Sequence, residues 1–361
     1  MQGKVIAMLA IMLCVLMGKP TAGADMAAQK KARKELRDHG ADFKRLPLWP
    51  ALLDEEDKPD DKSVFLTIDE RWTGGKDPLR YLKDLPNLKE IVFAHPDFGD
   101  DWCGVLREVH GLEGIFLQGR SFSDRGMEFL QGNKELRAIG LLETAVTDEG
   151  LKRLRGLTKL RWLNLALTDI TDAGLDNLAG LTELERLYLE GTRTTGKGLV
   201  SLKKLTKLRK LRLSHLLADK TDESPILQGL AAMRRLRELD ARNLHVRDAD
   251  LSALRQMSEL EDLRLTNSEI TDKRLAELSA LTKLKRLELN MSAVTSEGLK
   301  HLVAMQQLES LHLGSTRIDD NAVPHLQALK ALKELSISGT RVSPQAVEKL
   351  KRALPDLKVE N

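Results

Sequence analysis

The sequence repeats itself every 24 residues from about residue 85 to its end. Two successive copies, residues 157–180 and 181–204, read LTKLRWLNLALTDITDAGLDNLAG and LTELERLYLEGTRTTGKGLVSLKK. Further copies begin at Met257, Leu281 and Met305. A fixed period of this length is typical of repeat architectures, in which each unit buries its apolar face only against its neighbours. We therefore expect one long solenoid and not a pair of ordinary globular domains.

The spacing of leucines changes within each copy. Leu163 and Leu165 alternate with polar positions, which predicts a short strand with one buried face. Leu175, Leu178 and Leu181 follow with helical spacing. Each unit is therefore predicted to be a strand, a turn and a helix, and stacked units would share one continuous leucine core.

Thr-Asp pairs stand just before the predicted helices. Thr147-Asp148, Thr171-Asp172 and Thr271-Asp272 are examples. The threonine hydroxyl is expected to cap free N–H groups, and the aspartate is expected to face the positive end of the helix. A calcium ladder is disfavoured, because one carboxylate per turn does not supply the several oxygens that each ion needs.

These repeats resemble leucine-rich repeat proteins of the 24-residue kind with T-D-x-G-L in the convex part. The resemblance covers about residues 61–361. It implies an α/β fold, a horseshoe solenoid with a concave parallel β-sheet and convex helices, and such arrays are frequent in exported bacterial proteins. The repeats are also similar to those of F-box adaptors, which carry Cys where this chain has Thr144, Thr168 and Thr192.

A short apolar run opens the chain. Residues 5–17 are apolar, Lys4 precedes them, and Ala-Gly-Ala at 22–24 offers the small residues that signal peptidase requires. We predict a signal peptide over residues 1–24 and an exported mature chain that begins at Asp25. An uncleaved membrane anchor is the alternative. After cleavage, no remaining run is long and apolar enough to span a membrane.

The rest of the chain divides into a cap, an array and a remnant. Residues 25–84 are interpreted as an N-terminal cap with a helix over 27–39, an acidic loop over 54–61 and a strand over 64–68. The array spans residues 85–353, and residues 354–361 form a partial repeat. Caps of this kind protect the edge strands of a solenoid sheet.

Charge and motifs argue against several classes of function. The chain has 57 basic and 54 acidic residues, which is too balanced for a typical nucleic-acid binder. It contains no Gly-rich phosphate loop, no H-E-x-x-H and no C-x-x-C. Cys103 stands where other units place an inward leucine, which predicts a small buried thiol. We expect no catalysis, no cofactor and no metal site.

The concave face carries the most informative residues. Only 4% of the chain is aromatic, yet alternation along the predicted strands places three rings outward on this face. Exposed rings on neighbouring strands suggest a binding patch. We predict that a protein or peptide partner contacts the following residues: Phe116, Leu142, Trp162, Arg186, Tyr188, Glu190 and Arg212.

Three alternatives stay open at this point. Residues 46–53, which are rich in Leu, Pro and Trp, could fold onto the rings and cover them. The chain could instead be a substrate adaptor like the F-box proteins, or bind envelope carbohydrate by stacking on Trp162 and Tyr188. The charged strands that follow Tyr188 are interpreted as a solubilising, internally paired ladder. The oligomeric state is not predicted.

Overall fold

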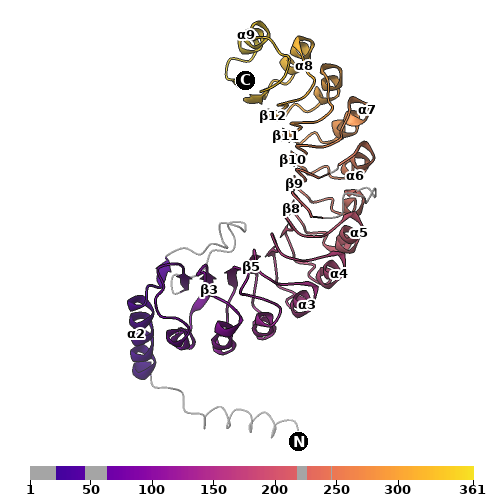
Figure 1. The fold of residues 1–361 in the computed structure, drawn as a ribbon. Coiled ribbons are helices and arrows are strands. Elements are labelled where there is room, and N and C mark those ends of the chain that lie inside the picture. The colour runs from indigo at the N-terminus through magenta and orange to yellow at the C-terminus, as the bar shows by residue number, and fades with distance from the viewer. Residues whose placement is uncertain (1–21, 45–62, 218–225, 245) are drawn as a thin grey trace, which may run out of the picture.

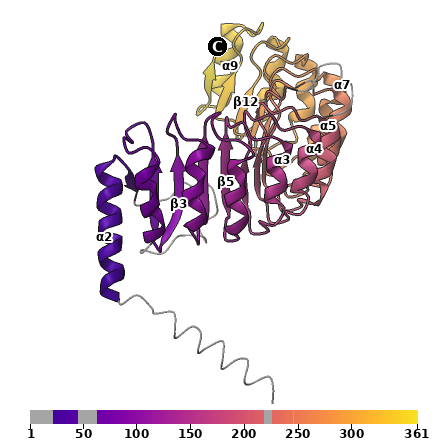
Figure 2. The ribbon, with the colours of Figure 1, turned by 60° about the horizontal axis from the view of Figure 1, so that its bottom comes forward.

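The computed structural model describes residues 22–44, 63–217, 226–244 and 246–361. In these segments one sheet runs through the molecule with its 14 strands in sequence order. The strands curve along the inner side of an arc, and the helices lie on the outer side (Figure 1). Turned by 60°, the arc shows the strands side by side with helix α2 at one end (Figure 2). The strands are β1 (Asp42–Lys44), β2 (Val64–Ile68), β3 (Leu88–Phe93), β4 (Gly114–Gln118), β5 (Ala138–Leu142), β6 (Trp162–Asn164), β7 (Arg186–Tyr188), β8 (Lys210–Arg212), β9 (Glu238–Asp240), β10 (Asp262–Arg264), β11 (Arg286–Glu288), β12 (Ser310–His312), β13 (Glu334–Ser336) and β14 (Lys358–Glu360).

Parallel pairing joins every neighbouring pair of strands from β2 onward. The predicted solenoid with a concave parallel sheet and convex helices is confirmed. Strand β1 pairs antiparallel with β2, and the strand expected over residues 64–68 is found there.

Each repeat turns from its strand to a short helix on the convex side. Most α-helices of the array last one turn and pass into or follow a 3₁₀ segment. The α-helices are α2 (Ala22–Asp38), α3 (Asp148–Leu151), α4 (Asp172–Leu175), α5 (Gly196–Leu199), α6 (Leu251–Leu254), α7 (Asp272–Leu275), α8 (Val323–Gln327) and α9 (Pro344–Ala353). The 3₁₀ helices are η3 (Asp77–Asp84), η4 (Asp100–Glu108), η5 (Gly126–Gly132), η6 (Lys152–Leu154), η7 (Asp176–Leu178), η8 (Val200–Lys204), η9 (Gln228–Leu230), η10 (Asp248–Asp250), η11 (Ala276–Ala280), η12 (Ser296–Leu302) and η13 (Asp320–Ala322).

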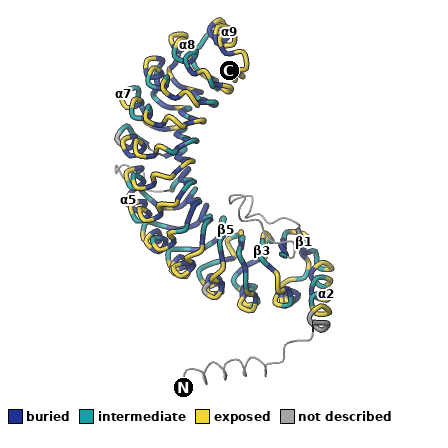
Figure 3. Tube along the Cα trace, turned by 180° about the vertical axis from the view of Figure 1, so that it is seen from behind, coloured by how far each residue is buried: buried dark blue, intermediate teal, exposed yellow. Residues whose placement is uncertain are grey.

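The core is one leucine-lined layer between the sheet and the helices. A single apolar cluster extends from Ala32 in α2 to Leu357 before β14. Leu163 and Leu165 from a strand, and Leu175 and Leu178 from the helical side, are all fully buried. Exposed residues gather along the outer, helical side of the arc (Figure 3). Stacking of units thus buries what no single unit could bury.

The N-terminal end is closed by helix α2. Ala32 and Leu36 on one side of this helix are fully buried and join the core. The helix was predicted over residues 27–39 and is observed from Ala22 to Asp38, followed by Gly40 at φ +96°, which satisfies the expected stop. The leader over 5–17, the segment 46–53 and the acidic loop over 54–61 lie outside the described residues.

Candidate functional site

The register of the strands builds two rows of side chains on the concave face. Because neighbouring strands pair residues one repeat apart, equivalent residues stand side by side across the sheet. The first row consists of Ala138, Trp162, Arg186, Lys210, Glu238, Asp262 and Arg286. The second row consists of Phe116, Gly140, Asn164, Tyr188, Arg212, Asp240 and Arg264. The two rows place Phe116, Trp162, Arg186, Tyr188 and Arg212 on one continuous surface.

Three aromatic rings meet in the two rows. The ring centroids of Phe116 and Trp162 are 5.3 Å apart, and those of Trp162 and Tyr188 are 5.4 Å apart with the rings nearly perpendicular. Gly140 makes room for this contact, because a Cβ there would lie 2.8 Å from the Phe116 ring. With Ala138, the rings form an apolar cluster separate from the main core. Edge contacts of this geometry stabilise ring clusters by about 0.5–1.5 kcal/mol per pair.

The expectation of freely exposed rings is wrong for two of the three. Trp162 is 4% exposed and Tyr188 is 8% exposed, whereas Phe116 is half-buried. Mutual ring packing and the small neighbours at Ala138 and Gly140 account for part of this burial. The Trp162 indole N–H is buried and has no hydrogen-bond acceptor among the residues that the structure describes. This donor is a polar group that a bound partner could satisfy.

Charged side chains border the ring cluster. The Arg212 guanidinium lies 4.7 Å from the centroid of the Tyr188 ring, a cation–π contact. Arg212 also lies 3.5 Å from one carboxylate oxygen of Glu190. The other oxygen of Glu190 is buried and has no hydrogen-bond partner in the described part of the chain. Burial raises the pKa of the Glu190 carboxyl, and Arg212 opposes that shift. Leu142 stands apart at the end of β5, where it pairs with Gln118 and does not join the ring cluster.

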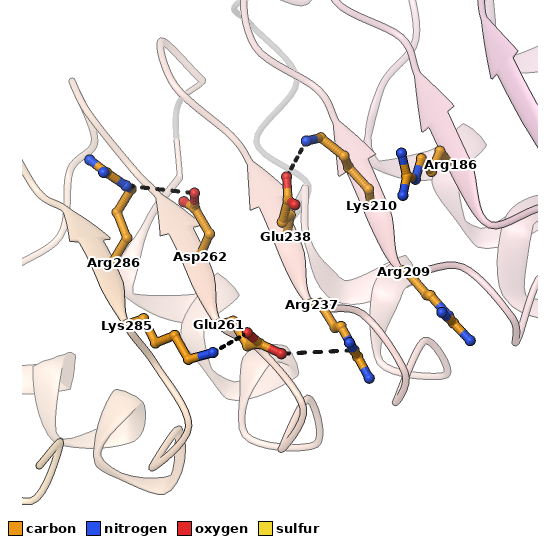
Figure 4. A pocket seen from close by; sticks show the side chains of 9 residues that line it. All are labelled: Arg186, Arg209, Lys210, Arg237, Glu238, Glu261, Asp262, Lys285 and Arg286. Atoms are coloured by element: carbon orange, nitrogen blue, oxygen red, sulfur yellow. Dashed lines mark hydrogen bonds and ion pairs between the residues drawn. The ribbon is translucent and has the colours of Figure 1, made fainter. Parts of the chain in front are cut away.

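A charged groove continues along the concave face from β7 to β11. Its volume is about 350 Å³. It is lined by Arg186, Arg209, Lys210, Arg237, Glu238, Glu261, Asp262, Lys285 and Arg286 (Figure 4). The bases and acids come from the first row and from the residues immediately before the strands. Reasoning from the sequence did not identify this groove, because it treated the whole segment as a paired ladder.

Most of the ladder is paired, as predicted. Arg264 contacts Asp262 at 2.8 Å and Glu288 at 3.6 Å. Asp240 accepts hydrogen bonds of 2.9 and 2.6 Å from the Arg242 guanidinium. Burial disfavours the charged form of Asp240, but these hydrogen bonds outweigh it and hold the pKa of this carboxyl below its ordinary value.

The region of Cys103 offers no reactive centre. Its thiol is 4% exposed, and burial together with Asp100 and Asp101 raises its pKa to about 12. Such a thiol is protonated at neutral pH and is a poor nucleophile. Within the part of the chain that the structure describes, no three His, Cys, Asp or Glu side chains gather as metal ligands. In the same segments, no helix has the length and apolar character needed to cross a bilayer.

Comparisons with known proteins agree on the fold. The family model described as "Leucine-rich repeat region" matches residues 134–359. An internalin from Listeria monocytogenes is 18% identical with a TM-score of 0.65, and the match covers 94% of each chain. A plant peptide hormone receptor, RGFR1, in complex with RGF2, is 16% identical with a TM-score of 0.51 over 78% of this chain and 48% of that one.

A leucine-rich repeat protein of Leptospira interrogans is 15% identical with a TM-score of 0.47, over 78% of this chain and 92% of that one. No curated protein matches the chain. The internalin and RGFR1 structures, with identities below 25%, show the fold and not a shared partner. The family model covers more than half of the sequence, and the stacked strand-and-helix units give it a structural basis. This chain belongs to the leucine-rich repeat proteins.

Proposed function

We propose that this chain is a non-catalytic interaction module that binds a partner polypeptide through its concave face. Leucine-rich repeat folds are typically protein-interaction modules. The observation that supports this face is the row arrangement, which joins an apolar ring cluster to unsatisfied polar groups. The Trp162 indole N–H is a buried donor and Oε2 of Glu190 a buried acceptor, and within the described segments neither atom has a hydrogen-bond partner. Protein interfaces commonly combine aromatic anchor residues with a few polar groups that form hydrogen bonds to the partner.

The proposed contact residues are those of the predicted patch: Phe116, Leu142, Trp162, Arg186, Tyr188, Glu190 and Arg212. A sheet held rigid by stacked repeats would lose little conformational entropy on binding. The receptor RGFR1, whose structure holds RGF2, provides a precedent for binding by this fold. The carbohydrate alternative has less support, because stacking on a sugar needs an open ring face, and Trp162 and Tyr188 are nearly buried.

Photo-crosslinking tests this proposal whatever the identity of the partner. A benzoylphenylalanine is placed at Phe116 or Ser336 on the concave face, and at Lys203 or Lys300 on the convex face as matched controls. We expect crosslinks to another protein from the concave positions and none from the convex ones. Crosslinks from the convex positions alone would refute the proposal.

The same experiment examines the covering segment. If residues 46–53 fold over the rings, Phe116 should crosslink to that segment of its own chain. Such a product at full yield would remove Phe116 from the partner surface. The concave position Ser336, far along the array, would then decide between a partner on this face and none.

We further propose that the chain is exported after loss of residues 1–24, with a cap over 25–84, an array over 85–353 and a partial repeat over 354–361. The leader pattern supports export. Intact-mass measurement of the protein from the cell exterior or envelope should give a chain that begins at Asp25. A chain that retains Met1 would favour the membrane-anchor alternative.

A further inference from the structure

The groove between β7 and β11 has an excess of positive charge. Six of its lining residues are basic and three are acidic, although the whole chain of 361 residues has a net charge of only +3. Each of the three acids already has a base. Glu238 pairs with Lys210, Asp262 with Arg286 at 3.8 Å, and Glu261 with Lys285 at 2.7 Å. The groove lining therefore has more basic than acidic side chains, and its three acids already have basic partners.

Arg186 is the basic residue of the groove that differs most from the others. Within the segments that the structure describes, its guanidinium forms no ion pair, and Figure 4 shows it beside Lys210 with no dashed contact. The register explains why. Its neighbours across the strands are Trp162 on one side and Lys210 on the other, so neither offers a carboxylate. Other arginines of the rows, such as Arg264, have an acid on an adjacent strand.

Two further cations lie at the same end of the groove. Arg209 and Arg237 precede β8 and β9 and occupy equivalent positions in successive repeats. The acidic partner of each arginine lies on the side away from the other arginine. Glu185 is 3.9 Å from Arg209, and Glu261 is 3.8 Å from Arg237. Two arginines thus occupy equivalent positions just before β8 and β9, whereas Lys210 and Glu238 within these strands carry opposite charges. A half-buried guanidinium near other cations is stabilised by a carboxylate that binds it with two hydrogen bonds.

We propose that this groove binds an acidic segment of the partner polypeptide, with Arg186 holding a carboxylate of that segment. The inference rests on the proposed function and specifies its partner. The groove crosses five strands about 4.8 Å apart, which is a span of roughly 19 Å and accommodates about six extended residues. Lys210 and Arg237 would attract further carboxylates of the same segment.

A nucleic acid fits the groove less well than a peptide. The evenly spaced phosphates of a nucleic acid would be repelled by the carboxylates of Glu238, Glu261 and Asp262 inside the groove. Bases bind single-stranded sites by stacking on exposed rings, but Trp162 and Tyr188 on the neighbouring strands are nearly buried. A peptide can instead place its carboxylates at the cations and leave neutral residues opposite the acids.

The test uses the full chain and a fluorescein-labelled hexaglutamate peptide, with binding followed by fluorescence anisotropy at low salt. Hexalysine and the oligonucleotide (dT)6 are the comparison probes. The variants are Arg186→Gln and Lys210→Gln. The matched control is Arg317→Gln, which removes an exposed arginine with no ion pair in the described segments, in the turn after β12. Thermal unfolding of each variant establishes that it folds.

We expect hexaglutamate to bind and hexalysine not to bind. Arg186→Gln should weaken hexaglutamate binding about tenfold, the scale of one charge-assisted contact. Lys210→Gln should weaken it as well, and Arg317→Gln should leave it within twofold. Equal losses in Arg186→Gln and Arg317→Gln would overturn the proposal, because binding would then follow net charge alone. Tighter binding of (dT)6 than of hexaglutamate would overturn it in favour of a nucleic-acid site.

Loss of the hexaglutamate effect, with concave crosslinks retained, would contradict the acidic-segment inference and leave the concave interaction surface standing. Crosslinks from the convex positions alone would contradict the proposed function, whatever hexaglutamate does.

Discussion

Asp148 of one repeat holds Thr171 of the next through two hydrogen bonds. The Thr171 backbone N–H donates to one carboxylate oxygen at 2.9 Å, and its hydroxyl donates to the other at 2.6 Å. The same pair of contacts joins Asp172 to Thr195, 23 residues apart. Thr171 in turn accepts a hydrogen bond from the N–H of Ala173 at the start of its helix. The aspartates therefore link neighbouring repeats on the convex side.

Loss of one such link should lower the stability of the array. Asp148→Ala leaves the Thr171 N–H and hydroxyl without their acceptor and should cost about 1–3 kcal/mol of unfolding free energy. Asp148→Asn should cost less, because the amide oxygen still accepts one bond. Urea unfolding followed by circular dichroism measures both. An Asp148→Ala variant as stable as the parent would show that the link contributes nothing.

The glycine of the T-D-x-G-L sequence leaves space for the aspartate of the preceding repeat. A Cβ on Gly174 would lie 2.2 Å from the Asp148 carboxylate, so Gly174→Ala should push the two repeats apart and destabilise the chain. In an Asp148→Ala background the same change should cost much less, which a double-mutant cycle detects. Gly180→Ala, with open space around its new Cβ, is the control. Equal costs of Gly174→Ala in both backgrounds would refute the steric link.

Met291 occupies a left-handed turn that recurs along the array. Its φ is +56°, and the equivalent Ser315 and Gly339 also have positive φ. Met291 is 56% exposed, so its side chain adds little packing. Met291→Gly should be more stable than Met291→Ala by about 1 kcal/mol, because glycine alone adopts this region freely. Paired thermal melts of the two variants measure this difference, and a more stable alanine variant would contradict the strain argument.

The Arg242–Asp240 pair should determine part of the acid stability. Because the pKa of Asp240 is lowered in the folded state, its contribution is present above the ordinary aspartate pKa and is lost as pH falls through the lowered value. Arg242→Gln removes the guanidinium from the buried Asp240 carboxylate, which keeps the 3.2 Å hydrogen bond from the backbone N–H of residue 242. Because the Arg242 side chain is 38% exposed, solvent screens the pair, and we expect a loss of about 1 kcal/mol at neutral pH.

That loss should shrink as the pH falls, because protonation of the Asp240 carboxyl removes the charge that Arg242 stabilises. Unfolding measured from pH 3 to pH 7 follows the difference. Arg234→Gln removes an exposed arginine of the same repeat and should change little at any pH. A cost of Arg242→Gln that does not depend on pH would exclude an electrostatic origin.

The repeat alone predicted the solenoid, but not the helix type. Leu175, Leu178 and Leu181 are spaced by three residues, which equals the period of a 3₁₀ helix, and α4 indeed passes into η7 after one α-helical turn. The Asp148–Thr171 link was missed because both residues were assigned to capping within their own repeats. The sequence does contain a sign of this link, because Asp148 and Thr171 are 23 residues apart, one less than the repeat period of 24.

The sequence predicted where the residues of the candidate site lie, but not how deeply the aromatic rings are buried. Alternation placed Phe116, Trp162 and Tyr188 on the concave face, and they lie there. Their burial depends on contacts between strands, such as the approach of Phe116 to Gly140, which alternation within one strand does not reveal. The missing partner of Arg186 could have been found by comparing residues one repeat away, since Trp162 and Lys210 flank it.

The concave face is proposed as the binding surface, and one binding measurement tests that claim directly. With the partner identified by crosslinking, its dissociation constant is measured for the parent chain, for Arg212→Glu on the concave face and for Lys203→Glu on the convex face. We predict that Arg212→Glu weakens binding at least about tenfold, and that Lys203→Glu leaves it within twofold. Weakening by Lys203→Glu with no effect of Arg212→Glu would contradict the claim.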